Sequence, residues 1–314
     1  MIITGKKFSK PELSRVINGD VTISDDEKIE RVRLDKKLVE LFPDYNRSTL
    51  QTFIKSGYVL VDQKPALKPN TLIEETAEIE LNLPENLTND DLKKAAIEKM
   101  RPKTLFEDEN VLVLDKPSGL LSMAKGEYTA EPTLEDYGLL VHRLDRDTSG
   151  VVILGKNEET QKMLRKQFQD RKAHKTYYAI VEGRPKLDEA MIDLPMSRNI
   201  KHPTTFIVDA NGKPAQTYYK VLKSAEVEHP ETGKSVTLSL LELRPTTGRT
   251  HQLRVHLKYL GTPILGDRVY GTAKPDTKLR LFLHAKTLEI TIPEGKRSIF
   301  ESPLPKEFDK ILKV

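Results

Sequence analysis

The run His142–Gly150, with the sequence HRLDRDTSG, places four charged side chains between two apolar segments. The flanking segments Leu139–Val141 and Val151–Leu154 are short and apolar, which is typical of buried strands. Two carboxylates and two guanidinium groups at the edge of a core are costly to desolvate. The run therefore predicts a reactive carboxylate held on a rigid frame. The structural alternative is a tight polar turn in which Asp147 and Ser149 bind nearby backbone.

A second polar run, Arg244–Leu257, leads into a segment with helical periodicity, which Gly261 and Pro263 end. One stripe of this helix is apolar and predicts a face packed on the core, and the other is polar and basic. The two stripes consist of Leu253, Leu257 and Leu260, and of His251, Arg254 and Lys258. The structural alternative is an ordinary amphipathic helix whose basic face lies in water.

Two strand-like segments carry further candidate residues. Lys175–Val181 is typical of a strand, and the alternation of side chains predicts Tyr177 and Tyr178 on opposite faces. Leu114–Leu120 is typical of a strand that ends in a Pro-Gly turn, where Lys116 either contacts a phosphate or supports the neighbouring loop. A basic stretch at 161–175 predicts a solvated helix face or a phosphate-binding surface.

Together these segments resemble the motifs of the RluA family of RNA pseudouridine synthases, in particular its RluC and RluD members. The resemblance implies that Asp145 is the catalytic nucleophile and that Arg254 forms an ion pair with it. It also implies that Tyr177 stacks on the target uracil and that its hydroxyl assists proton removal from C5. Leu253 would line the pocket floor, and Arg143 would fill the space left by the flipped base. The remaining implied RNA contacts are His142, Lys116 and Lys175, and the remaining implied pocket residues are Thr148 and Gly150.

The reaction implied by this resemblance is the isomerisation of specific uridines to pseudouridine in structured RNA. The glycosidic bond breaks, the uracil rotates in the pocket, and C5 joins C1′. A uridine in a helix must be flipped out to react. No cofactor is expected, because the new bond replaces the broken one. No metal site is expected either, and no Gly-rich nucleotide-binding loop is present in the sequence.

An upstream segment, 28–83, resembles an S4 RNA-binding domain. Its periodicity predicts a helix with Leu34, Leu38 and Leu41 on one face, then a second helix and short strands. The candidate RNA contacts are Lys36, Lys37, Arg47 and Lys55. Acidic residues balance the basic residues here, so contact with RNA depends on a local face rather than on net charge. The alternative is a small docking domain that touches no RNA.

The expected architecture is an α+β chain with four parts. They are an N-terminal extension at 1–27, a small α/β S4-like domain at 28–83, a linker with a helix-like stretch at 84–103, and a catalytic domain at 104–314. For the catalytic domain we expect a mainly antiparallel mixed sheet of the pseudouridine synthase type.

Composition narrows the function classes. Charged residues make up 31% of the 314 residues and the net charge is +4, which is compatible with a polyanionic partner. Cysteine is absent, which excludes disulfides, thiolate nucleophiles and Cys-type zinc sites. Neither a membrane-spanning apolar run nor a secretory signal is evident. We therefore expect a cytoplasmic monomer with RNA as its partner and no membrane association.

The RNA target and two other function classes stay open. An S4-like domain ahead of the catalytic domain favours large-subunit ribosomal RNA, with transfer RNA as the alternative. A non-catalytic RNA-binding or ribosome-assembly factor is a second class, and the presence of Asp145, Tyr177 and Arg254 argues against it. A hydrolase that uses a histidine base with Ser149 or Thr250 ranks last, because no nucleophile-elbow pattern is present.

Overall fold

The computed structural model describes residues 31–43, 45, 47–83, 97, 100–124, 131–274 and 276–312. The chain divides into two compact units, one formed by Met1–Lys99 with Ala124–Pro132 and the other by Met100–Met123 with Thr133–Val314. The predicted extension at 1–27 and nearly all of the helix-like stretch at 91–100 lie outside the described residues.

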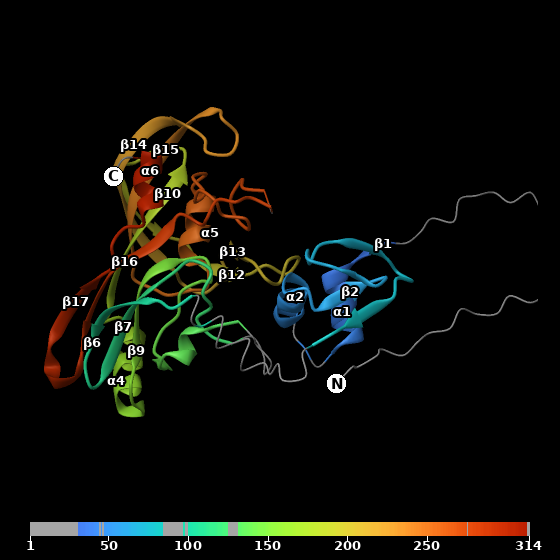
Figure 1. The fold of residues 1–314 in the computed structure, drawn as a ribbon. Coiled ribbons are helices and arrows are strands. Elements are labelled where there is room, and N and C mark those ends of the chain that lie inside the picture. Colours follow the sequence, from blue (N-terminus) through green and yellow to red (C-terminus); the bar gives the residue numbers. More distant parts are fainter. Residues whose placement is uncertain are drawn as a thin grey trace, which may run out of the picture. The chain divides into compact units, whose positions relative to one another are not determined.

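Among its described residues, the smaller unit contains helices α1 and α2 and short strands (Figure 1, blue and cyan). Its elements are β1 (Arg31–Arg33), α1 (Leu34–Leu41), α2 (Arg47–Lys55), β2 (Val59–Val61), β3 (Lys64–Pro65), β4 (Leu72–Glu74) and β5 (Ile79–Leu81). Strands β3, β2 and β5 form a three-stranded sheet, and β1 pairs with β4. The predicted apolar face is buried at Leu34 and Leu38, but Leu41 is 46% exposed because α1 ends there.

The larger unit is built on one extended sheet (Figure 1, green to red). Its strands are β6 (Lys103–Glu107), β7 (Val111–Lys116), β8 (Leu139–Leu140), β9 (Ser149–Gly155), β10 (His174–Glu182), β11 (Glu189–Asp193), β12 (Met196–Arg198), β13 (Phe206–Val208), β14 (Gln216–Glu228), β15 (Ser235–Pro245), β16 (Leu283–Thr291) and β17 (Arg297–Glu301). Its helices are η1 (Leu134–Asp136), α4 (Glu158–Gln169), α5 (Gln252–Tyr259), η2 (Pro293–Gly295) and α6 (Lys306–Leu312).

Ten of these strands form the extended sheet, and β12 and β13 pair with each other outside it. The main path of the extended sheet runs in the order β11-β14-β15-β10-β16-β9-β7-β6. Strand β17 pairs with β16, and β8 pairs with β9. The β16–β9 pair is parallel, and the other pairs in this sheet are antiparallel. The expected α+β fold with a mainly antiparallel mixed sheet is therefore confirmed.

Strand β9 lies inside the core and carries the end of the HRLDRDTSG run. All seven of its residues are buried. Val151 and Ile153 pack in one cluster with Leu164 of α4, whereas Val152 and Leu154 pack in another. Because both faces of the strand are covered, the polar residues that precede it are attached to a rigid support.

Glycine is required at position 150, where β9 runs parallel to β16. Gly150 has φ +114°, and an added Cβ would lie 2.2 Å from the carbonyl oxygen of Ala285. A side chain therefore cannot be placed here without moving the backbone.

Among the described residues, no helix is long and apolar enough to cross a membrane.

Candidate active site

The loop between β8 and β9 is anchored by the segment that follows β7. Ser122 Oγ donates to the carbonyl of Leu144 at 2.7 Å and accepts from the backbone N–H of the same residue at 3.1 Å. Ser118 Oγ donates to the carbonyl of Asp147 at 2.8 Å. These bonds fix the backbone on both sides of Asp145, so the position of its carboxylate is determined before any substrate binds.

Lys116 also anchors the loop between β8 and β9. Its side chain is 0% exposed, and Nζ donates to the carbonyls of Pro117, Arg146 and Thr148 at 3.1, 2.8 and 2.7 Å. Burial lowers its pKa to about 7. The predicted RNA contact at Lys116 is therefore wrong, because this ammonium group is buried and already bound to three carbonyls. The alternative, support of the loop, fits these bonds.

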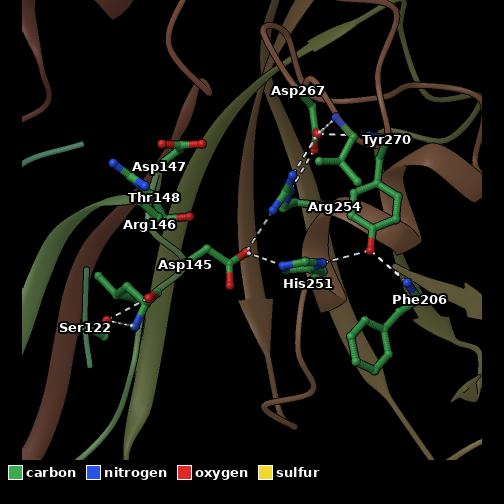
Figure 2. A network of polar contacts seen from close by, with 12 residues as sticks. Ser122, Asp145, Arg146, Asp147, Thr148, Phe206, His251, Arg254, Asp267 and Tyr270 are labelled. Atoms are coloured by element: carbon green, nitrogen blue, oxygen red, sulfur yellow. Dashed lines mark hydrogen bonds and ion pairs between the residues drawn. The ribbon is translucent and has the colours of Figure 1, made fainter. Parts of the chain in front are cut away.

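Asp145 faces Arg254, which is held from its other side by a second carboxylate. Arg254 Nη1 lies 3.3 Å from Asp145 Oδ2, while its Nε and Nη2 each donate to Asp267 at 2.8 Å. Asp267 Oδ1 also accepts from the backbone N–H groups of Val269 and Tyr270. Figure 2 shows this chain of three charged groups. The bidentate pair with Asp267 fixes the guanidinium plane, which leaves Nη1 directed at Asp145.

Helix α5 is buried on more sides than its sequence pattern predicts. The side chain of Arg254 is 9% exposed, and all residues from Gln252 to Leu257 are buried. The structural alternative, a basic face in water, is therefore wrong at Arg254, and the ion pair of Arg254 with Asp145 that the resemblance implies is present. Although burial alone lowers the pKa of Arg254, the two carboxylates outweigh it and raise the pKa above its ordinary value.

Asp267 and Tyr270, to which the sequence motifs assign no role, both belong to this network. Tyr270 Oη lies 2.8 Å from Nδ1 of His251 and accepts the backbone N–H of Phe206 at 2.9 Å. The other ring nitrogen of His251, Nε2, lies 3.9 Å from Asp145 Oδ2. Two hydrogen bonds thus link β13 through Tyr270 to His251, and the longer 3.9 Å contact continues from His251 to Asp145 (Figure 2).

These groups open into a pocket of about 520 Å³. It is lined by Asp145, Tyr177, Leu253, Arg254 and His251, together with His142, Arg143, Thr148 and Lys175. Asp145 is the one carboxylate among the described lining residues, which also include five cations, Arg143, Arg171, Lys175, Arg249 and Arg254. A volume of this size suits a small organic group such as a nucleoside, and the excess of positive charge suits an anionic one.

Tyr177 and Tyr178 have different surroundings, as the strand alternation predicts. Tyr177 lines the pocket, whereas Tyr178 is not among the lining residues and lies opposite Glu242 of β15 in the sheet register. Burial, together with the negative charge of Asp145, raises the pKa of Tyr177 above its ordinary value. The phenol therefore stays protonated at neutral pH and offers an apolar ring and a hydroxyl rather than a phenolate base.

Two further predicted residues have roles other than those expected. Gly150 is buried beneath the loop against Ala285 and is not among the pocket-lining residues, so its predicted pocket role is wrong. His142 does line the pocket, but it stacks on Phe168 at 4.5 Å between ring centroids and accepts the N–H of Ile153 through Nε2. Burial and the nearby Lys175 lower the pKa of His142 to about 3. This imidazole is therefore neutral and carries no charge for a phosphate.

In the smaller unit, the predicted RNA-contacting residues differ in their availability. Lys36 and Lys55 are exposed. Lys37 lies 3.8 Å from both Glu40 and Glu75. Arg47 is half-exposed and binds the buried Asp35. No group of histidine, aspartate or glutamate residues suited to a metal ion occurs in the part of the chain that the structure describes.

Comparison with known proteins decides the family. Residues 110–259 match the model of the RNA pseudouridylate synthase family, and residues 32–79 match that of the S4 domain. The ribosomal large subunit pseudouridine synthase D of Nitrosomonas europaea is 34% identical over 93% of this chain and 86% of the relative. The chain belongs to the RNA pseudouridylate synthase family. It is thus an RNA pseudouridine synthase with an N-terminal S4 domain, as the sequence motifs predict.

Other members of the family agree with this assignment. The dual-specificity RNA pseudouridine synthase RluA of Vibrio parahaemolyticus is 41% identical over 62% of this chain and 81% of the relative. Among solved structures, human RNA Pseudouridylate Synthase Domain Containing 1 is similar with a TM-score of 0.56 and 27% identity, over 65% of this chain and 84% of that one. The enzyme activity is therefore an RNA isomerisation that acts on uridine.

Proposed function

We propose that this pseudouridine synthase modifies specific uridines of large-subunit ribosomal RNA in the cytoplasm and that Asp145 is its catalytic nucleophile. The observation that carries the proposal is that Asp145 is the single carboxylate among the described residues that line a basic pocket. Such a pocket attracts an anionic nucleotide and presents one carboxylate to it. The ribosomal RNA target is supported by relatives named ribosomal large subunit pseudouridine synthase D and C.

In the proposed mechanism the carboxylate of Asp145 drives cleavage of the glycosidic bond. Arg254 orients this carboxylate through its 3.3 Å contact. The freed uracil rotates while it is held between the Tyr177 ring and Leu253, and C5 then joins C1′. When C5 joins C1′, the carboxylate of Asp145 is free again and accepts the proton lost from C5, because it is the single carboxylate among the described lining residues. The raised pKa of Tyr177 makes its neutral phenol unsuited to that role.

RNA binding is assigned to the mouth of the pocket and to the S4 domain. Arg143 is exposed beside the nucleophile, where its guanidinium can replace a flipped base in the stack. Lys175 lines the pocket and is a candidate for a phosphate contact. In the S4 domain, the exposed Lys36 and Lys55 are the candidates that carry no ion pair among the described residues.

The test is site-resolved pseudouridine mapping of ribosomal and transfer RNA. Three cultures are compared: cells that lack the gene, cells that carry the intact chain, and cells that carry Asp145→Asn. The proposal predicts ribosomal sites that disappear in the first culture and return only with the intact chain. Sites confined to transfer RNA would contradict the target, and sites restored by Asp145→Asn would contradict the nucleophile.

A further inference from the structure

The two oxygens of the Asp145 carboxylate have different surroundings. The contacts with Arg254 at 3.3 Å and with His251 at 3.9 Å both end on Oδ2. Among the described residues, no hydrogen bond or ion pair reaches Oδ1. Figure 2 shows both dashed lines meeting at one oxygen while the other points away. One oxygen is therefore held by the protein, and the other is available to react.

The hydrogen bonds of Tyr270 favour one of the two neutral tautomers of His251. The backbone N–H of Phe206 donates to Tyr270 Oη, since a backbone N–H can act only as a donor. The single hydroxyl proton of Tyr270 is then free to bind His251 Nδ1, which lies 2.8 Å away. An imidazole that accepts at Nδ1 carries its N–H at Nε2, and Nε2 faces Asp145.

The His251 ring is also clamped in place. The ring of Phe206 meets it edge to face with centroids 5.8 Å apart, and the ring of Tyr270 does so at 5.5 Å. The charged and titratable groups around His251 are Asp145, Arg254, Asp267, Arg143 and Tyr270. Burial lowers the pKa of His251 despite the opposing effect of Asp145, so that the ring is neutral at neutral pH.

We propose that His251 is a positioning residue for the nucleophile: its Nε2–H and Arg254 together hold Oδ2 of Asp145, so that Oδ1 is the oxygen presented to the uridine. Tyr270 and the backbone N–H of Phe206 fix the tautomer that this role requires. The inference rests on the proposed role of Asp145. The distance of 3.9 Å is long for a hydrogen bond, and catalytic contacts of free enzymes commonly shorten when the substrate binds.

A neutral N–H donor suits this position because the carboxylate of Asp145 must keep its negative charge to act as a nucleophile. Arg254 is shared between Asp145 and the closer Asp267, so it does not neutralise the nucleophile completely. A second full cation would quench the remaining charge, whereas an imidazole N–H orients the carboxylate with only a dipole. His251 therefore adds direction without removing nucleophilicity.

The first test is the protonation state of His251 in the full-length chain. Histidine labelled with ¹⁵N, observed by NMR at pH 7 and assigned through the His251→Gln variant, reports both ring nitrogens. The proposal predicts a neutral ring protonated at Nε2, with partial loss of that preference in Tyr270→Phe. A ring protonated at Nδ1, or at both nitrogens, would overturn the proposal.

The second test is multiple-turnover pseudouridine formation on transcribed large-subunit ribosomal RNA, with tritium release from C5-labelled uridine as the readout. His251→Leu is expected to lower kcat roughly 10- to 100-fold with KM nearly unchanged, as expected for a misdirected nucleophile. His251→Gln, which retains an N–H donor, should recover most of the loss. Tyr270→Phe should lower kcat by a smaller factor.

Tyr219→Phe is the matched control for Tyr270→Phe, because Tyr219 is also buried and its hydroxyl donates to a backbone carbonyl, that of Leu187. We expect it to leave kcat unchanged. Full activity of His251→Leu beside an inactive Asp145→Asn would overturn this inference alone. Full activity of Asp145→Asn would overturn the proposed nucleophile and the inference with it. Equal losses in kcat for Leu and Gln at position 251 would also contradict an N–H donor role.

Discussion

Two aspartates of this chain, Asp35 in the S4 domain and Asp145 in the catalytic domain, each pair with arginine but differ in how completely they are bound. Asp35 is 0% exposed and accepts five hydrogen bonds, spread over both oxygens, from Arg33, Arg47 and Gln51. The side chain of Asp145 is 19% exposed, and one oxygen is contacted. The same residue type is thus structural where its hydrogen-bonding capacity is saturated and available for chemistry where it is not.

The largest expected effect comes from Asp145→Asn. Removing a nucleophile that no other residue replaces should lower the rate by at least about 10³-fold. Because Asp145 makes few contacts, the midpoint of thermal unfolding should change little, and RNA affinity should persist. Calorimetry and filter binding beside the activity assay check this separation. A variant that unfolds at much lower temperature would show that Asp145 is structural like Asp35.

Arg254→Gln affects both kinds of carboxylate, because Arg254 contacts the reactive Asp145 and the structural Asp267. It leaves Asp267, whose side chain is 0% exposed, without its cation, and we expect a loss of about 3–5 kcal/mol in the free energy of unfolding together with most activity. Denaturant unfolding measures the first quantity.

Arg184→Gln is the control for that measurement. Arg184 pairs with Asp188 at the surface, where both side chains are exposed, and such a pair contributes about 0–1 kcal/mol. Equal losses of stability in the two variants would contradict the buried network.

Asp35→Asn tests the structural role of Asp35 through the pH dependence of the stability of the S4 domain. Although burial raises the pKa of Asp35, its bonds to Arg33, Arg47 and Gln51 outweigh this effect and lower the pKa to about 2. The stabilisation is therefore present above the ordinary pKa of about 4 and is lost as the pH falls from about 4 to about 2. Its size is on the order of 2 kcal/mol.

Hydrogen exchange of the S4-domain amides at pH 7 and at pH 3 checks this prediction. The intact chain should lose local stability at pH 3, whereas Asp35→Asn should be less stable at pH 7 and should change less with pH. Glu40→Gln, which alters an exposed side chain at the same helix, is the control. The same pH response in the intact chain and Asp35→Asn would mean that Asp35 is not the responsible group.

The smallest expected effect is on RNA affinity. Replacing the exposed Lys36 and Lys55 with alanine should weaken binding modestly and reduce the slope of affinity against salt by about one unit per lost phosphate contact. Binding titrations at several salt concentrations measure the slope. An unchanged slope would favour the alternative of a docking domain that does not touch RNA.

Part of the fold of each domain could be predicted from the sequence, but the burial of individual charged side chains could not. The helix that begins at Leu34 and the strands at 151–154 and 175–181 follow from local sequence patterns, and the structure confirms them. The burial of Lys116 could not be predicted, because its three carbonyl partners come from its own turn and from a loop 30 residues away. A strand that ends in a turn is equally compatible with an exposed lysine.

The support of the candidate nucleophile was also beyond local patterns. Asp267 binds Arg254 only because the chain turns back after α5, and the helical period gives no sign of that return. The polar stripe of α5 is by itself compatible with a face in water, and the buried carboxylate that excludes this alternative at Arg254 could not be predicted. Tertiary pairing of charges thus determines where sequence periodicity fails in this protein.

The most direct test of the central claim is single-turnover formation of pseudouridine by the purified full-length chain and by Asp145→Asn on transcribed large-subunit ribosomal RNA, with the fraction of bound RNA measured in the same samples. The account predicts pseudouridine at discrete sites with the intact chain and none with the variant, at equal RNA occupancy. Product formed by Asp145→Asn at a rate within about tenfold of the intact chain would contradict the account.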